Sequence, residues 1–153
     1  MTERFETFTM LMAKINRSIR RIKLREMAEH RLGSVHTSCL YYLSRDPGLT
    51  ATDLCELCQE DKATISRALG WLENEGYILS RDSGGKRYKS PIALSEMGMS
   101  VGREIEDKID MVLDAVGSGL TDEERKEFYR CLSIISTGLE QAANSKQENK
   151  TQI

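Results

Sequence analysis

The chain has 153 residues, a length typical of one globular domain or of a small domain with helical extensions. Its 22 basic and 24 acidic residues give a formal net charge of -2, so the whole-chain balance does not select a nucleic-acid partner. No apolar stretch approaches the roughly 20 residues that a membrane span needs, and the charged start lacks the apolar core of a signal peptide. We therefore expect a cytoplasmic protein without a membrane partner. Its 4 cysteines are too few for a disulfide framework, and reduced thiols are expected.

The N-terminal segment predicts a long amphipathic helix. Its apolar residues alternate spacings of three and four, the pattern of a helix that packs against another helix. The helix is expected to run almost to Leu32, and Gly33 and Ser34 are expected to break it. The apolar seam consists of Phe5, Phe8, Met12, Ile15, Ile19 and Ile22.

Two shorter helices follow. The first has an apolar side that includes Val35, Cys39 and Leu43, and it ends at Asp46-Pro47-Gly48. Thr50 caps the next helix in a sequence that resembles a capping box. Its predicted buried side consists of Leu54, Leu57 and Cys58.

A turn at Gln59 and Glu60 leads into a fourth helix, which Asp61 caps and Gly76 ends. Ile65, Leu69 and Leu72 share one face at helical spacing, which predicts a buried side. The first turns of the opposite side are small, polar and cationic, as in a recognition helix that meets base edges in the major groove. These predicted DNA-binding residues are Lys62, Ala63, Thr64, Ser66 and Arg67.

A basic hairpin is predicted after this helix. Residues 77–79 have strand character, residues 82–85 can turn, and residues 86–94 can return, with Pro91 marking an edge strand. Lys86 and Arg87 lie near its glycine-rich tip and are predicted to contact DNA. The predicted order is a short capped helix, a turn, a recognition helix and a hairpin. This is the order of elements in a winged helix-turn-helix.

Two further helices are predicted at the C-terminal end. Ser95 caps one, which Gly117 and Gly119 close; Thr121 begins a capping box for the other, and the polar tail is expected to fray from Asn144. The two ends of the chain thus carry apolar seams that could pair between subunits, or be buried within one monomer. The predicted dimer interface consists of Phe5, Phe8, Met12, Ile15, Phe128, Leu132, Ile135 and Leu139.

The predicted fold is mainly α with a small β-hairpin wing, a winged helix-turn-helix flanked by long dimerisation helices. Residues 1–33 form the N-terminal dimerisation helix and residues 34–94 the winged helix-turn-helix domain. Residues 95–144 form the C-terminal dimerisation helices, and residues 145–153 the polar tail.

This order of elements resembles the MarR family of transcription regulators, named for multiple antibiotic resistance. The residues that carry the resemblance are the opening 61–67, the exit 72–78, Lys86-Arg87 and the segment 94–98. The resemblance implies a homodimer that binds pseudo-palindromic duplex DNA, a repressor or activator that responds to a small ligand. The family commonly has Asp two residues before the wing arginine, where this chain has Gly85.

Arg67 and Arg87, the two arginines predicted to contact DNA, each have two interpretations. Arg67 can fork onto guanine or clamp a phosphate, or it can be a solvated residue paired with a carboxylate. Arg87 can enter a narrow minor groove, or it can be a solubilising turn charge. We favour DNA contact for both. The basic face of the first helix, with Arg17, Arg20 and Arg21, is instead interpreted as solvated or paired with the acidic later helices.

The Cys55 and Cys58 spacing invites a redox or zinc interpretation. Thioredoxin-type chemistry needs this motif at a strand-to-helix junction, whereas here it lies inside an amphipathic helix. Structural zinc needs two further ligands, and His30, His36 and Cys39 belong to another segment. We therefore expect no metal and no cofactor, with Cys58 buried as a small hydrophobe.

No catalytic constellation is apparent, so the protein is not expected to be an enzyme. The leading hypothesis is a homodimeric regulator, a repressor relieved by a small aromatic or amphipathic ligand. The residues proposed to line the ligand pocket are Arg31, His36 and Tyr42. The alternatives are a cysteine-based redox-sensing regulator and a winged-helix protein-interaction module without DNA binding.

Overall fold

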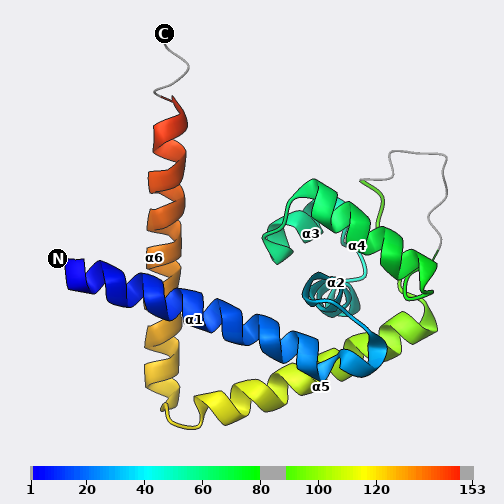
Figure 1. Cartoon of the computed structure of the whole chain (residues 1–153), viewed down its shortest axis with the longest axis horizontal. Coiled ribbons are helices and arrows are strands. Elements are labelled where there is room, and N and C mark those ends of the chain that lie inside the picture. Colours follow the sequence, from blue (N-terminus) through cyan, green and yellow to red (C-terminus); the bar gives the residue numbers. More distant parts are fainter. Residues whose placement is uncertain (1, 80–88, 149–153) are drawn as a thin grey trace. The chain divides into compact units, whose positions relative to one another are not determined.

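The computed structural model describes residues 2–79 and 89–148, and helices account for most of them. The chain divides into two compact units, Met1–Asp110 and Met111–Ile153, and the division falls inside a helix. The helices of the described residues are α1 (Thr2–Glu26), the 3-10 helix η1 (Ala28–His30), α2 (Ser34–Arg45), α3 (Ala51–Cys58), α4 (Lys62–Asn74), α5 (Glu96–Gly117) and α6 (Asp122–Glu148) (Figure 1).

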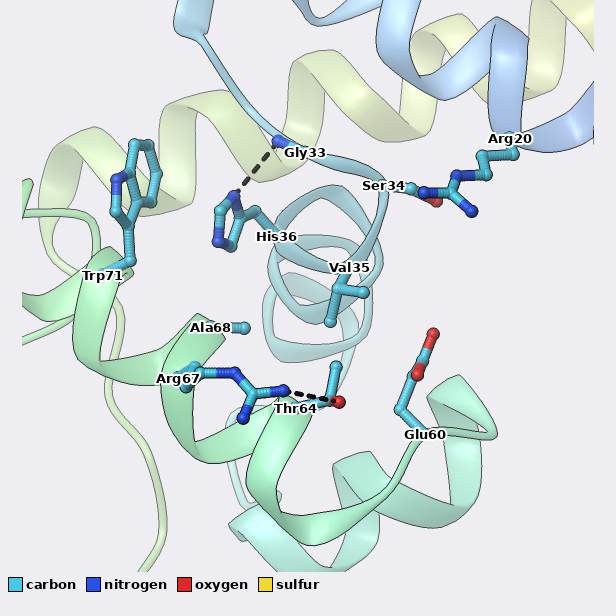
Figure 2. A pocket seen from close by; sticks show the side chains of 10 residues that line it. All are labelled: Arg20, Gly33, Ser34, Val35, His36, Glu60, Thr64, Arg67, Ala68 and Trp71. Carbon is cyan, nitrogen blue, oxygen red and sulfur yellow. Dashed lines mark hydrogen bonds between the residues drawn. The ribbon is translucent and has the colours of Figure 1, made fainter.

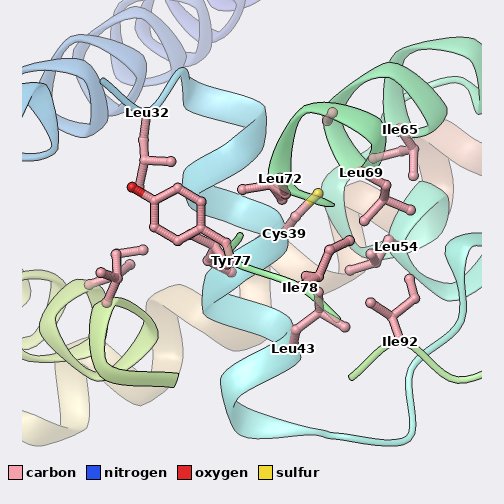
Figure 3. Close-up of a cluster of buried hydrophobic side chains, with 14 of the residues drawn as sticks. Leu32, Cys39, Leu43, Leu54, Ile65, Leu69, Leu72, Tyr77, Ile78 and Ile92 are labelled. Atoms are coloured by element: carbon pink, nitrogen blue, oxygen red, sulfur yellow. The ribbon is translucent and has the colours of Figure 1, made fainter. Parts of the chain in front are cut away.

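The core of the first unit lies between α2, α3 and α4 (Figure 3). Each helix contributes aliphatic side chains that are wholly withdrawn from solvent. Burying one such side chain is worth about 1.5–3 kcal/mol, so together they fix how these helices pack. The fully buried members from these three helices are Cys39, Leu40, Leu43, Leu54, Ile65, Leu69 and Leu72.

Four predicted helix caps are confirmed. The Asp53 amide donates to Thr50 Oγ1 at 3.3 Å, and the Thr50 amide donates to Asp53 Oδ2 at 2.7 Å. The pKa of Asp53 is lowered by its hydrogen bonds with Thr50. The other three caps are Asp61 for α4, Ser95 for α5, and Thr121 with Glu124 for α6.

The first helix ends earlier than predicted. It stops at Glu26, and η1 and a left-handed residue, Arg31 at φ 56°, complete the segment that was expected to be helical almost to Leu32. Met27 and Leu32 are 1% and 3% exposed, and both belong to the core. In a continuous α-helix, two residues five apart would point about 140° from each other. The helix must therefore break for both to reach the same core.

Two smaller predictions are also wrong. Leu57 is 42% exposed, because the buried stripe of α3 runs through Ala51 and Leu54 and continues along partly buried Cys55 and Cys58. Spacings of three and four along these residues define one helix face, and Leu57 lies beside it. The C-terminal helix does not fray from Asn144 but continues to Glu148.

The base of the predicted hairpin is present as a short antiparallel contact. Among the described residues, the β pairing is a bridge between Ile78 and Leu94, next to a 2.9 Å hydrogen bond from the Leu79 amide to the Ala93 carbonyl. The Ile92 amide donates to the Leu49 carbonyl at 2.9 Å and joins the segment before α5 to the segment before α3. Residues 80–88, which include Lys86 and Arg87, lie outside the described residues.

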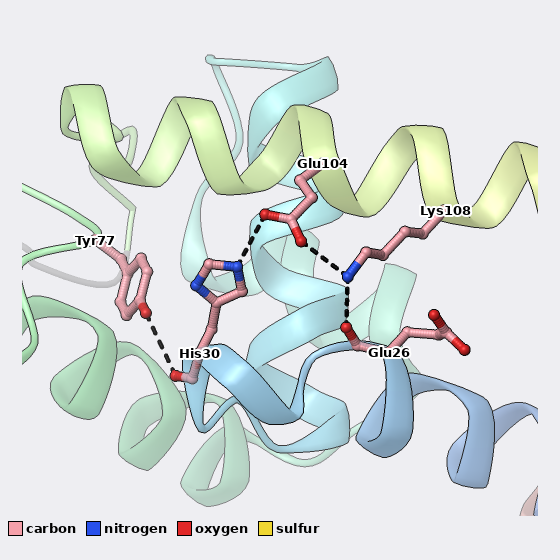
Figure 4. Close-up of polar contacts among 5 residues, drawn as sticks. All are labelled: Glu26, His30, Tyr77, Glu104 and Lys108. Atoms are coloured by element: carbon pink, nitrogen blue, oxygen red, sulfur yellow. Dashed lines mark hydrogen bonds and ion pairs between the residues drawn. The ribbon is translucent and has the colours of Figure 1, made fainter.

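A polar network joins η1 to α5 (Figure 4). Glu104 pairs with His30 Nε2 at 2.9 Å and with Lys108 Nζ at 2.8 Å. Lys108 Nζ also donates to the Glu26 carbonyl at 2.6 Å, and the Tyr77 hydroxyl donates to the His30 carbonyl at 3.4 Å. The network thus joins the end of α1 and the segment that follows α4 to the part of α5 that belongs to the first unit.

Candidate nucleic-acid interface

The opening of α4 is held by its cap. Asp61 Oδ1 accepts a 2.7 Å hydrogen bond from the Thr64 amide, and hydrogen bonds from Thr64 lower the pKa of this exposed carboxylate. A preceding turn with Gln59 in the left-handed conformation, φ 53°, separates α3 from α4. The amide of Gln59 and that of Glu60 donate back to α3 carbonyls, which fixes the angle between the two helices.

The inner and outer faces of α4 separate as predicted. Ile65, Leu69 and Leu72 are fully buried, and this anchoring sets the rotation of the helix about its axis. Arg67 and Thr64 lie one turn apart on the accessible side, where Arg67 Nη2 donates to Thr64 Oγ1 at 3.2 Å. Of the α4 residues predicted to contact DNA, Thr64 is partly exposed and the exposed ones are Lys62, Ala63, Ser66 and Arg67.

A cavity of about 590 Å³ lies beside this face of α4 (Figure 2). Arginines from two helices line it, Arg20 from α1 and Arg67 from α4, and Glu60 adds a carboxylate, so its lining carries two positive charges and one negative charge. The lining residues are Arg20, Gly33, Ser34, Val35, His36, Glu60, Thr64, Arg67, Ala68 and Trp71.

The aromatic wall of this cavity is built by two stacked rings. His36 and Trp71 have ring centroids 4.3 Å apart and planes 12° apart. The Gly33 amide donates to His36 Nδ1 at 3.1 Å, which assigns the neutral ring its proton on Nε2. Burial lowers the pKa of His36 and so favours this neutral form. The cavity therefore combines a flat neutral wall with two guanidinium groups and the Glu60 carboxylate.

One of the three residues predicted for a ligand pocket lines this cavity. His36 lines the cavity, whereas Arg31 and Tyr42 are not among its lining residues. Arg31 is exposed at the end of η1, and Tyr42 is partly buried, with its ring 5.2 Å from that of Tyr41. Sequence reasoning missed Trp71 as a pocket residue, although its position on α4 one turn after Arg67 gave a usable signal.

The predicted interface seams are accessible in each unit. On α1, Ile15 is 44% exposed and Phe8 and Met12 are partly exposed, while the side chain of Phe5 lies outside the described part of the chain. On α6, Leu132 is partly exposed. The other three α6 residues are more open: Phe128 at 49%, Ile135 at 42% and Leu139 at 56%.

Two other properties of the described residues bear on function. None of the helices within residues 2–79 and 89–148 is long and apolar enough to cross a bilayer. In the same residues, no group of three or more His, Cys, Asp or Glu side chains is arranged to hold a metal ion.

Comparisons with known proteins identify relatives of this chain. A sequence model described as MarR family matches residues 32–87. Over 81 residues the chain is 28% identical to the HTH-type transcriptional regulator PetP of Rhodobacter capsulatus. That match covers 53% of this chain and 49% of PetP, so the chain matches about half the length of this curated relative.

Solved structures give the same fold. The S. aureus MepR–DNA complex is similar with a TM-score of 0.75 at 20% identity, over 88% of this chain and 97% of that chain. The Mycobacterium tuberculosis MarR family protein Rv2887 in complex with salicylic acid is similar with a TM-score of 0.59 at 22% identity, over 82% and 94%. The sequence model and the fold thus agree: residues 32–87 match the MarR family, and the helical architecture of the chain is that of MarR-family structures.

Proposed function

We propose that this protein regulates transcription by binding duplex DNA, with α4 in the major groove. The observation that carries the proposal is the division of α4 into a fully buried face and an exposed cationic one. A major groove about 12 Å wide admits an α-helix, and a helix whose rotation is fixed by its core presents the same side chains to every site. The DNA in the MepR complex supports this choice of partner.

Within this interface we assign distinct roles to three of the exposed α4 residues. The Arg67 guanidinium can donate two hydrogen bonds to the O6 and N7 atoms of guanine. Lys62 at the first helical position is suited to a phosphate, and Ala63 leaves room for close approach to a base. Lys86 and Arg87 belong to the proposed wing, which would hold the adjacent minor groove.

The proposed regulator is a homodimer. Both α1 and α6 expose large apolar side chains to solvent. A partner subunit would bury this apolar surface. A two-fold axis would set the two α4 helices roughly 34 Å apart, one turn of DNA, as a pseudo-palindromic operator requires.

We further propose repression that a small aromatic carboxylate relieves. The cavity offers Arg20 and Arg67 to a carboxylate and the stacked wall of His36 and Trp71 to a ring. Salicylic acid in the Rv2887 complex is a compound of this class. Since Arg67 serves both the cavity and the DNA face, an occupied cavity draws this guanidinium away from the base it would read.

The experiment that tests DNA binding is selection of bound fragments from the source genome, followed by titration of the selected duplex at several salt concentrations. Binding to phosphates releases counterions, so the logarithm of the affinity should fall steeply and linearly with the logarithm of the salt concentration. The absence of any selected fragment and of a salt slope on random duplex would favour a protein-interaction module.

A further inference from the structure

His36 has one ring nitrogen committed to the N-terminus of α2. Gly33 is the N-cap of this helix, and its amide donates to His36 Nδ1 at 3.1 Å (Figure 2). A backbone N–H group can only donate, so Nδ1 has to offer a lone pair. A proton bound at Nδ1 would break this hydrogen bond, because two N–H groups would then face each other. The Gly33 contact thus holds the ring in its neutral form.

The groups around the ring determine what a proton on His36 would meet. Trp71 stacks on one side of the ring, with centroids 4.3 Å apart and planes 12° apart. The charged groups that line the same cavity are Arg20 from α1, Glu60 from the turn before α4 and Arg67 from α4. A protonated His36 would therefore add a third positive charge to a lining with one negative charge. Burial lowers the pKa of His36 and also favours the neutral ring.

We propose that the anion that enters this cavity binds together with a proton, which His36 takes up. A bound carboxylate supplies the negative charge that the third cation needs, so it favours the imidazolium form of His36. The π face of Trp71 attracts a cation, so the charged ring can remain stacked on the indole. Proton and anion then bind cooperatively, and each raises the affinity of the cavity for the other by the same factor.

The hydrogen bonds at the start of α2 provide a second reason for this coupling. When Nδ1 carries a proton, the Gly33 amide loses its acceptor, and Nδ1 becomes a second donor in the same place. Gly33 and His36 both line the cavity. After a rotation of the ring, one carboxylate can accept hydrogen bonds from both donors. The anion thus replaces the acceptor that the proton removes, and an unpaired amide is avoided.

This inference rests on the anion site proposed above and adds the proton as a second ligand of that site. A carboxylic acid that dissociates releases both an anion and a proton. Both products then act on the cavity in the same direction. Acidification should therefore lower the concentration of anion that fills the cavity.

Nuclear magnetic resonance of the full chain tests the protonation of His36 directly. The chain has 2 histidines, so the ring signals of His36 can be assigned with the variant His30→Gln. In the free protein at neutral pH, the ring nitrogen shifts should report a neutral His36 with its proton on Nε2. Saturating salicylate should move the titration of His36 to higher pH. A free ring with its proton on Nδ1, or a titration that salicylate does not move, would overturn the inference.

Calorimetry measures the coupling between proton and anion. Salicylate stays anionic from about pH 5 to about pH 8, because a carboxyl group ionises at about pH 4 or below. Over this range we expect the affinity for salicylate to be about tenfold higher at the acid end, a coupling of ordinary size. Near neutral pH, the observed enthalpy should vary with the ionisation enthalpy of the buffer, which shows that a proton is taken up on binding.

His36→Asn is the matched variant, since its side-chain oxygen can accept from the Gly33 amide but cannot titrate. It should bind salicylate without proton uptake and with nearly the same affinity at both ends of the pH range. His30→Gln removes the other histidine and should keep the pH dependence of wild type. Circular dichroism must show that both variants are folded. Proton uptake that persists in folded His36→Asn protein would assign the proton to another group and overturn the inference.

These measurements separate the inference from the proposed function. Wild-type protein that binds salicylate equally across this pH range, without proton uptake, would overturn the proton coupling and leave the proposed ligand class in place. Absence of salicylate binding across the whole range would overturn both. Titration of the genome-selected duplex without salicylate judges the proposed DNA binding by itself.

Discussion

Gly98 lies against Tyr77 so closely that a β-carbon added to Gly98 would stand 1.9 Å from the Tyr77 carbonyl oxygen. The same carbonyl accepts hydrogen bonds from the Ser95 amide at 3.0 Å and from Ser95 Oγ at 3.1 Å. It cannot retreat without breaking the contacts that begin α5. This approach therefore ties the start of α5 to the segment that leaves α4.

We predict that Gly98→Ala lowers the free energy of unfolding by about 3 kcal/mol, because the added methyl group forces backbone apart. Urea unfolding followed by circular dichroism measures the change. Gly70→Ala is the matched control, since a β-carbon at Gly70 meets nothing within 4 Å. In an exposed helix position it should raise stability by up to about 1 kcal/mol. Equal stability of Gly98→Ala and wild type would contradict the close approach.

The Glu104 network predicts a dependence of stability on pH. Hydrogen bonds from Lys108 and His30 lower the pKa of Glu104, so its contribution to stability is present above the unfolded value of about 4.3 and is lost as the pH falls through the lower folded value. Glu104 raises the pKa of Lys108, so that contribution is present below about 10.4 and is lost as the pH rises through the higher folded value.

Glu104→Gln should therefore lower the free energy of unfolding at pH 7. Below pH 4, the free energy of unfolding of this variant should fall less steeply with pH than that of wild type. Because the Glu104 side chain is 37% exposed, solvent screening limits the loss to about 1 kcal/mol. Urea titrations from pH 3 to pH 8 measure both effects. The exposed carboxylate of Asp107 on the same helix provides the control, Asp107→Asn, for which we expect little change. If the free energy of unfolding falls equally at acid pH in Glu104→Gln and in wild type, the Glu104 network does not stabilise the protein as proposed.

Local features of the fold could be predicted from the sequence. The caps at Thr50 and Asp61, and the buried side of α4 with Ile65 and Leu69, follow from side-chain chemistry and helical periodicity within one segment. These rules fail where two faces compete. Leu57 fits the apolar pattern of α3, yet neighbouring helices cover the stripe next to it.

Contacts between segments could not be predicted. The break at Met27 depends on a core that α2 and α4 build, and the sequence of α1 alone continues in helical phase. The cavity joins Arg20 to Trp71 across 51 positions, and no spacing rule relates them.

We predict that the protein is a dimer in dilute solution and that its apolar seams hold it together. Replacing Ile15 and Leu132 together with Glu would bury charge against apolar surface and should dissociate or unfold the protein. Sedimentation velocity with circular dichroism separates these outcomes. Gln141→Glu, at an exposed position of α6, should leave the mass unchanged. A wild-type protein that sediments as a stable monomer would rule out this assembly.

A ligand prediction follows from the cavity. Salicylate should bind wild-type protein, and Arg20→Ala should weaken that binding about tenfold by removing one guanidinium partner of the carboxylate. Linkage requires that bound duplex lower the affinity for salicylate by the same factor by which bound salicylate lowers the affinity for duplex. Calorimetric titrations with and without duplex test this reciprocity. Arg17→Ala, an exposed arginine on the same helix that does not line the cavity, is the control. Equal salicylate affinity with and without duplex would exclude control by that compound.

The most direct test of the central claim is the effect of Arg67→Ala on binding to the selected duplex, with Arg17→Ala as a control of the same charge change. If α4 reads DNA, Arg67→Ala should weaken specific binding by roughly 1–3 kcal/mol and relax the base preference at one position. The Arg17→Ala protein should bind like wild type. Circular dichroism must show that both variants are folded. Wild-type affinity and unchanged base preference in folded Arg67→Ala protein would contradict α4 as the reading helix.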